Sequence, residues 1–217
     1  MTGQLIFNLI NIKNFNSEDF YVNENNIEAS ELINIWPNWF NGAAVIFGSE
    51  KSGKSHLANI WKEKAKANIY DLENKFLLEN IDTNGNFVLD NFHNLSKDDE
   101  ETFFHIYNRT ISNRNNILIT LDKNKFRKIN LKDLESRFNS FSSATIKPPD
   151  DNLLNALILK FFQDQQINVE PSVVKFIVNR IERDYGEIFN FLKKIDSLSL
   201  ENKSKISTSF LNKFFRF

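Results

Sequence analysis

The eight residues from Gly48 to Ser55, which directly follow five apolar residues, restrict the fold of this chain more than any other segment. They read Gly48-Ser49-Glu50-Lys51-Ser52-Gly53-Lys54-Ser55 and match G-x-x-x-x-G-K-[ST] at every fixed position. The glycines allow backbone amides to turn inward around phosphates. Lys54 can neutralise phosphate oxygens, and the Ser55 hydroxyl can bind Mg²⁺. The segment therefore predicts a loop that binds the phosphates of ATP or ADP, between a buried strand and a helix.

Short apolar runs alternate with amphipathic segments around this loop. The runs at 43–47, 69–71, 87–90 and 117–120 predict strands, and the segments 54–67 and 97–113 predict helices. Another helix is expected over 27–40, where apolar residues recur at helical spacing until Pro37 ends the pattern. This alternation predicts an α/β fold in which helices flank a parallel sheet.

The composition changes at Lys147-Pro148-Pro149. Adjacent prolines interrupt regular structure, and the residues beyond them predict only helices, at about 152–165, 171–183, 187–198 and 208–215. We therefore expect three parts: an N-terminal arm over residues 1–26, a nucleotide-binding α/β domain over 27–149, and a small all-helical domain over 150–217.

The composition also excludes several classes of function. With 27 basic and 28 acidic residues, the net charge of −1 gives no electrostatic basis for gripping DNA, so direct sequence-specific DNA binding is not expected. The absence of cysteine excludes disulfides, thiolate zinc sites and thiol catalysis. The sequence has neither a signal peptide nor an apolar run of membrane-spanning length. We expect a cytoplasmic protein without a membrane partner.

An aspartate follows the apolar run 87–89. Asp90 is expected to hold Mg²⁺ together with Ser55, at the carboxyl edge of the sheet. The next residue is Asn91, where many ATPases of this class have a glutamate that orients the attacking water. An amide cannot accept a proton from water, so we expect at most weak intrinsic ATPase activity.

These motifs and the helical tail resemble the AAA+ module of the bacterial initiator DnaA, and in particular the Hda type of DnaA-related regulator. The resemblance covers nearly the whole chain. It implies that the segment 19–26, including Tyr21 and Val22, contacts the adenine, and that His56 and Asp122 belong to the same nucleotide site. It also implies that Lys147-Pro148-Pro149 is the hinge into a lid domain.

The resemblance assigns two further features to partner proteins. Residues 134–138 are similar to the family motif called box VII, which makes Arg137 an arginine finger acting on a γ-phosphate held by another subunit. The N-terminal peptide resembles the segment with which such regulators dock on the DNA polymerase sliding clamp. Its candidate clamp-binding residues are Gln4, Leu5, Phe7 and Leu9.

The chain departs from the family at two places. In the family, the sensor II arginine reaches from the lid to the phosphates. Gly186 occupies that position here, and Arg183 is the nearest substitute. This departure weakens the expected coupling between lid and γ-phosphate. In addition, the sequence ends at Phe217, where DnaA continues into a DNA-binding domain. We therefore expect a regulator rather than an initiator.

The sequence thus favours a regulator of replication initiation that binds the sliding clamp and stimulates ATP hydrolysis by DnaA in trans. Assembly of several copies into a homo-oligomer is compatible with the same resemblance. One alternative is a helicase loader or other DnaA-like adaptor that uses ATP to remodel a partner. A small-molecule P-loop kinase is a further alternative, although it gives no role to Arg137 or to the helical tail.

Overall fold

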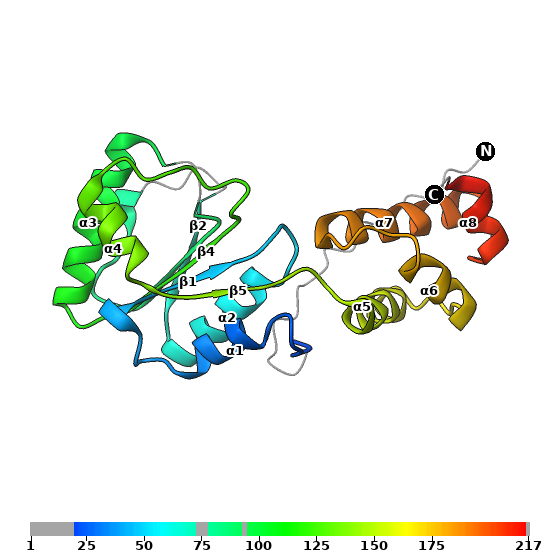
Figure 1. Ribbon diagram of the computed structural model, residues 1–217, viewed down its shortest axis with the longest axis horizontal. Coiled ribbons are helices and arrows are strands. Elements are labelled where there is room, and N and C mark those ends of the chain that lie inside the picture. Colours follow the sequence, from blue (N-terminus) through cyan, green and yellow to red (C-terminus); the bar gives the residue numbers. More distant parts are fainter. Residues whose placement is uncertain (1–19, 73–77, 93–94, 216–217) are drawn as a thin grey trace, which may run out of the picture.

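The computed structural model describes residues 20–72, 78–92 and 95–215 of the 217-residue chain. An α/β part and a group of helices lie end to end (Figure 1). The candidate clamp-binding residues Gln4, Leu5, Phe7 and Leu9 lie outside the described residues.

The α/β part contains a five-stranded sheet in which every paired strand is parallel. The strand order is β2-β3-β4-β1-β5, so β1 lies between β4 and β5. The fold-class prediction of a parallel sheet flanked by helices is confirmed. The strands are β1 (Ala43–Phe47), β2 (Asn68–Asp71), β3 (Phe87–Asp90), β4 (Ile117–Leu121) and β5 (Ser142–Thr145).

Helices cover both faces of this sheet (Figure 1). On one face α1 (Ile27–Asn34) and α2 (Lys54–Ala65) pack against alternate residues of the central strands, with Trp61 fully buried among them. On the other face α3 (Lys97–Ser112) and α4 (Lys132–Asn139) pack against the remaining strand residues, around Phe92 and Phe103. Because both faces are covered, the central strands are continuous apolar runs, which is why the sequence revealed them.

The first helix is shorter than expected. It ends at Asn34 rather than continuing to Phe40, because a proline at position 37 cannot continue a helix and disfavours helical backbone in the residue before it. The chain then runs back so that Trp39 packs against Trp61 and donates from Nε1 to the Leu32 carbonyl at 2.7 Å. A short 3-10 turn, η2 (Phe40–Gly42), leads into β1.

The helical part has its own apolar core. Its helices are α5 (Asp151–Asp164), α6 (Pro171–Val178), α7 (Tyr185–Glu201) and α8 (Thr208–Phe214). All four helices expected beyond the prolines are present, although α6 ends five residues before the predicted position 183. Side chains at Asp150, Asp184 and Ser207 cap α5, α7 and α8 by accepting backbone N–H groups.

One tyrosine joins the two parts. Tyr185, at the start of α7, is buried in the apolar cluster that also contains α1 and α2. Its hydroxyl donates to the Lys147 carbonyl at 3.1 Å. Burial, assisted by the charge of Asp150, raises the pKa of Tyr185 to about 12, so the hydroxyl remains a donor at neutral pH.

Among the described residues, no helix is both long and apolar enough to cross a membrane.

A buried carboxylate fixes the start of α4, the helix that carries Arg137. Glu100 on α3 is 3% exposed and accepts hydrogen bonds from the backbone N–H groups of Asn130 and Leu131 and from the Asn130 side chain, at 2.8 to 3.1 Å. Leu131 is the residue that precedes the first turn of α4. Glu100 therefore ties α4 to α3.

We predict that Glu100→Ala lowers the free energy of unfolding by about 3 kcal/mol, because the hydrogen bonds that Asn130 and Leu131 donate to a buried carboxylate are lost. Glu101→Ala is the matched control, since Glu101 is the exposed neighbour on the same helix. Urea unfolding followed by far-UV circular dichroism measures both changes. Equal effects of the two substitutions would contradict this role for Glu100.

Candidate phosphate-binding site

The loop 48–53 connects β1 to α2 at the carboxyl edge of the sheet. Its two glycines are required for different reasons. A Cβ at Gly48 would lie 2.5 Å from the Ser52 hydroxyl, so a side chain there would displace Ser52. Gly53 has φ of 102°, and a Cβ there would lie 3.1 Å from the Phe20 ring. The loop therefore has the tight backbone that the sequence motif predicts.

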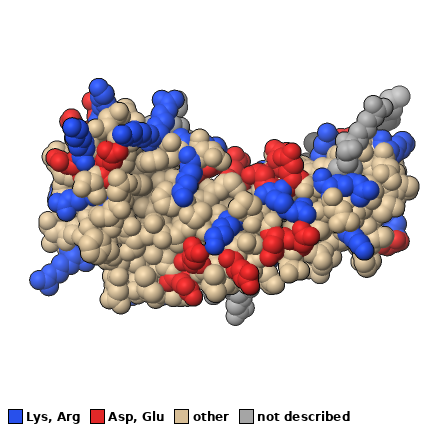
Figure 2. All heavy atoms as spheres, viewed as in Figure 1, with Lys and Arg blue, Asp and Glu red and all other residues tan. Residues whose placement is uncertain are grey.

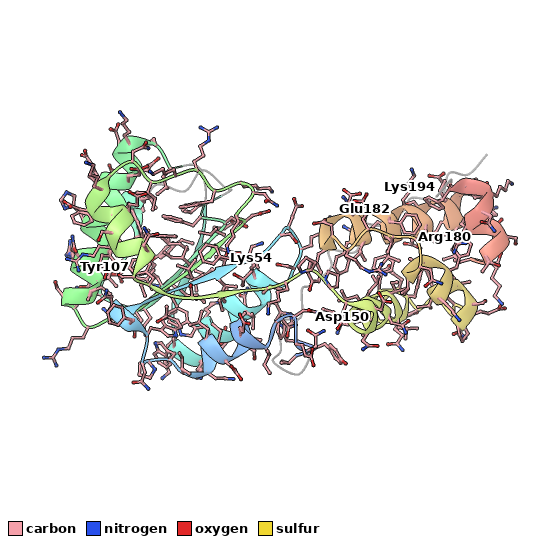
Figure 3. All side chains as sticks on the ribbon, viewed as in Figure 1. Lys54, Tyr107, Asp150, Arg180, Glu182 and Lys194 are labelled. Carbon is pink, nitrogen blue, oxygen red and sulfur yellow. The ribbon has the colours of Figure 1, made fainter. Side chains whose placement is uncertain are left out.

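Lys54 directs its ammonium group back over this loop (Figure 3). Its Nζ donates to the carbonyls of Gly48 and Ser49 at 2.9 and 2.7 Å, and the residue is 7% exposed. Burial lowers the pKa of Lys54, and the nearby carboxylates of Asp122 and Asp90 act in the opposite direction. A polyphosphate beside Nζ would add negative charge and favour the ammonium form further.

The structure brings both predicted aspartates to the same edge. Asp90 ends β3, is buried, and accepts a short hydrogen bond from the Thr120 hydroxyl. Asp122 directly follows β4, is also buried, and accepts from the Asn124 backbone N–H at 2.9 Å. The charges of both carboxylates act to raise the pKa of Lys54, so the three groups lie near one another.

The fit of this edge to Mg²⁺ follows from its donor set. Ser55 lies in the first turn of α2, and Asp90 supplies a carboxylate. No cluster of three or more candidate metal ligands occurs within the described residues. Mg²⁺ typically takes one or two protein oxygens and completes its shell with phosphates and water. Ser55 and Asp90 fit a metal ion of this kind, which would arrive with the nucleotide.

Asn91 is held in a fixed orientation. Its φ of 61° is in the left-handed region, its backbone N–H donates to the Thr120 hydroxyl at 3.1 Å, and its Nδ2 donates to an Asp71 carboxylate oxygen at 3.0 Å. The ends of β2, β3 and β4 are thereby joined by side-chain hydrogen bonds. Sequence reasoning missed Asp71 and Thr120, because each lies at the end of an expected strand without a motif of its own.

The segment before α1 lies beside the loop. Phe20 packs edge to face with the His56 ring, at 5.3 Å between ring centroids, and its ring also borders Gly53. Tyr21 and Val22 are 58% and 47% exposed. The structure thus places Phe20, which sequence reasoning did not single out, against the loop. Adenine contact by Tyr21 and Val22 stays a prediction, and Asp19 lies outside the described residues.

The tip of the loop contacts two other segments. Lys51, with φ of 61°, donates from Nζ to Asn190 Oδ1 on α7 at 2.5 Å. Glu50 pairs with Lys125 at 3.2 Å, and this partner lowers the pKa of the Glu50 carboxyl. Asn190 lies one helical turn beyond Gly186, so an amide on α7 reaches the loop where the family arginine is missing.

Arg183 does not take over the role of that arginine in this structure. Its guanidinium pairs with Asp151 at 2.7 Å and donates to the carbonyls of Val178 and Ile181, both at 2.8 Å. All of these partners belong to the helical part. Gly186 itself is buried in the first turn of α7.

Arg137 lies at the opposite edge of the sheet. It lines a hollow of about 510 Å³ with Asn41, Phe104, Asp133, Ser136 and Ser140. Asn41 precedes β1 and donates from Nδ2 to the Ser140 hydroxyl at 2.9 Å, which places this hollow at the amino end of β1. The five residues of β1 separate it from the phosphate loop, a length of about 16 Å.

The electrostatics of Tyr107 agree with this placement. Tyr107 donates its hydroxyl to the Asn41 carbonyl at 3.1 Å, and burial raises its pKa while the charge of Arg137 acts to lower it. Figure 3 shows Tyr107 and Lys54 well apart along the sheet. The structure therefore does not bring Arg137 together with the other predicted site residues.

Comparison with known proteins finds that the chain is similar to proteins of replication initiation. The family model described as "Hda, lid domain" matches residues 150–215. The DnaA initiator of Buchnera aphidicola subsp. Cinara cedri (strain Cc) is 24% identical over 192 residues, which cover 77% of this chain and 44% of the relative. The initiator of Thermomicrobium roseum is 28% identical over 178 residues, which cover 71% and 38%. The chain thus spans less than half the length of these relatives.

Solved structures show the same fold. AMPPCP-bound DnaA from Aquifex aeolicus superposes with a TM-score of 0.67 at 19% identity, over 87% of this chain and 67% of that one. Domain III of Thermotoga maritima DnaA gives 0.70 at 16% identity, over 94% and 98%. The Thermotoga maritima RuvB motor gives 0.59 at 16% identity, over 79% and 60%.

We predict that Lys54→Ala weakens binding of ATP at least about tenfold, because a charge-assisted contact with the phosphates is lost. Lys62→Ala is the matched control, since Lys62 lies farther along α2 and pairs with Glu63. Fluorescence titration with a labelled ATP analogue and Mg²⁺ measures both affinities. If Lys54→Ala binds as tightly as the native chain, the loop is not a phosphate site.

Proposed function

Because this chain is a DnaA-related AAA+ protein with an Hda-like lid, we propose that it binds ATP or ADP and regulates replication initiation by stimulating ATP hydrolysis on DnaA. The observation that carries this proposal is the position of Arg137. Its guanidinium lies at the amino end of β1, whereas the chain's own phosphate loop begins at the carboxyl end. This separation supports an action of Arg137 on a nucleotide that another subunit holds.

The chemistry of a guanidinium suits that task. It remains charged, and its planar fork can contact two oxygens of a γ-phosphate at once. In ATP hydrolysis, water attacks the γ-phosphorus while the bond to the β-phosphate oxygen breaks, and negative charge shifts onto that oxygen. An arginine supplied by a neighbouring subunit stabilises this charge and accelerates the step by about 10³ to 10⁵.

The chain's own site is proposed to bind nucleotide but to hydrolyse it slowly. Lys54 supplies a cation over the loop, Asp90 and Ser55 would hold the Mg²⁺ that shields phosphate charge, and Asp122 completes the acidic edge. Asn91 offers an amide that is already donated to Asp71. No carboxylate follows Asp90 to accept a proton from water, so the bound nucleotide has mainly a structural role.

Support for an adenine nucleotide comes from the site and from the similar folds. The backbone of the loop and the ammonium of Lys54 form an anion-binding concavity at the start of α2. Two of the similar solved structures are DnaA bound to AMPPCP. We propose the same class of ligand here, as ATP or ADP.

Contact with the sliding clamp is proposed for the N-terminal peptide, through Gln4, Leu5, Phe7 and Leu9. Short peptides bind pockets on a partner protein through a few anchoring side chains. Hydrogen bonds to the Gln4 side-chain amide would fix the position of the peptide in the pocket. Tethering to a clamp on DNA would raise the local concentration of Arg137 near DnaA without any new contact. The near-neutral charge of the chain is compatible with reaching DNA only through such a partner.

A DnaA-like helicase loader is the remaining candidate of the binding class. Both candidates use the same nucleotide site, but a loader would bind helicase and ignore the clamp. A small-molecule kinase is less favoured, because the phosphate site faces a helical lid with its own core and Arg137 lies at the far edge of the sheet.

We predict that Arg137→Ala abolishes stimulation of DnaA, with a loss of about 10³-fold or more in the rate of ATP hydrolysis. Arg137→Lys should recover little of it, since an ammonium lacks the planar fork. ATP-loaded DnaA is mixed with clamp, DNA and this chain, and release of labelled phosphate is followed. Arg180→Ala in the lid is the matched control, because the Arg180 guanidinium contacts the Phe176 ring and carbonyl within the lid.

Stimulation that is unchanged by Arg137→Ala would overturn the proposal. The same reaction, repeated with Gln4→Ala and combined with a clamp pull-down, distinguishes the regulator from the helicase loader. If the chain is the regulator, Gln4→Ala reduces both clamp capture and clamp-dependent stimulation. A loader would be captured by helicase instead, with no effect of Gln4.

A further inference from the structure

Lys51, at the tip of the phosphate loop, has a backbone conformation that a lysine seldom adopts. Its φ of 61° lies in the left-handed region, where a Cβ is crowded by a carbonyl oxygen. Lys66 has a similar φ of 50°, but it caps the end of α2, where left-handed residues are common. Within a loop, a residue with a side chain keeps this conformation where its surroundings hold it. The tip of the loop therefore depends on the contacts that its side chains make.

Two neighbouring side chains tie the tip to different parts of the molecule. Glu50 pairs at 3.2 Å with Lys125, which follows β4. Lys51 donates from Nζ to Asn190 Oδ1 on α7 at 2.5 Å. Figure 1 shows that α7 begins beside the loop between β1 and α2. The first contact connects the tip to the sheet, and the second connects it to the lid.

The second contact takes its cation from the loop and not from the lid. Gly186, in the first turn of α7, has no side chain, and the first basic residue of this helix is Lys193. Arg183, just before α7, is paired within the lid. Asn190 instead offers a neutral amide oxygen to the Lys51 ammonium group. Because both partners are side chains of this chain, the contact does not require a γ-phosphate.

Ser52, the residue after Lys51, indicates what the held loop binds. It is 7% exposed, and its hydroxyl lies beside Gly48 without a hydrogen-bond partner in the described part of the chain. A buried hydroxyl without a partner is unfavourable, and a phosphate oxygen inside the loop would supply one. The backbone of such a loop encloses the α- and β-phosphates, which ADP and ATP share. The conformation of the tip therefore affects both nucleotides.

We infer that the Lys51–Asn190 contact holds the lid against the phosphate loop and slows the release of ADP and ATP to the same extent. This inference rests on the proposed function, because it requires that the loop binds ADP or ATP. A lid that contacted the γ-phosphate would instead retain ATP better than ADP. Lys51 and Asn190 are thus positioning residues, which act on the nucleotide through the loop.

The test measures the release of labelled nucleotide from the whole chain. The chain is loaded with fluorescent ADP or fluorescent ATP and Mg²⁺, excess unlabelled ATP is added, and the dissociation rate constant is recorded. Asn190→Ala is expected to raise this constant about fivefold for both nucleotides, because a hydrogen bond from a charged group is lost. In a chain that already carries Lys51→Met, Asn190→Ala is expected to have no further effect. Asn190→Asp should keep release slow, because a carboxylate also accepts from the ammonium group.

Lys66→Met and Ser197→Ala are the matched controls. Lys66 is an exposed lysine with positive φ at the other end of α2. Ser197 is an exposed polar residue two turns beyond Asn190 on α7. Both variants should release ADP and ATP at the native rate.

The outcomes separate this inference from the proposed function. If the native chain binds nucleotide but Asn190→Ala releases both nucleotides at the native rate, or only ATP faster, the inference is wrong while nucleotide binding stands. Additive effects of Lys51→Met and Asn190→Ala would also overturn it, since independent sites behave in this way. If release depends on the contact but the chain does not stimulate DnaA, the inference stands and the regulatory function falls. If the native chain binds neither nucleotide, both are overturned.

Discussion

The pairing of β1 with its two neighbours is the constraint on which both ends of this molecule depend. β1 pairs in parallel with β4 along all five of its residues and with β5 along four of them. Its carboxyl end leads directly into the phosphate loop, and its amino end follows the turn that is hydrogen-bonded to α3, α4 and β5. Because the strand is buried on both faces, neither end can shift without disturbing the core.

The two ends of β1 therefore carry different candidate sites. The loop, Asp90, Asp122 and Lys54 converge at one edge, where we propose that a polyphosphate binds. Arg137 and its hollow lie at the other edge, against Asn41 and Ser140. Figure 2 shows acidic and basic side chains intermixed both at the end of the molecule away from the lid and near the junction with the lid. Under the proposed function, one end binds the chain's own nucleotide and the other acts on the nucleotide of a partner.

Among the described residues, the lid contacts the rest of the chain through apolar packing and hydrogen bonds. Tyr185 packs into the cluster under α1 and α2 and donates to the Lys147 carbonyl, while Lys51 reaches Asn190. Gly186 provides no side chain toward the phosphates. We therefore expect the lid position to depend little on whether a γ-phosphate is present, which agrees with a mainly structural nucleotide.

Sequence reasoning found those parts of the fold whose signal is local. The apolar runs of β1, β3 and β4 and the glycine and lysine spacing of the loop revealed the sheet and the site, because burial on both faces and phosphate binding each restrict residue type strongly. β5 was missed because Ser142 to Thr145 forms a polar edge strand with one paired side. The Asp71–Asn91 contact and the place of Phe20 depend on tertiary packing, which no spacing in the sequence encodes.

The position of Arg137 could be predicted only through the family resemblance, since its relation to β1 depends on how α4 packs. The central claim is that this arginine does not serve the chain's own nucleotide. Calorimetric titration of the isolated chain with ATP and Mg²⁺ tests it directly. The account predicts that Arg137→Ala binds ATP within about twofold of the native affinity, and a loss of about tenfold or more in a folded variant would contradict it.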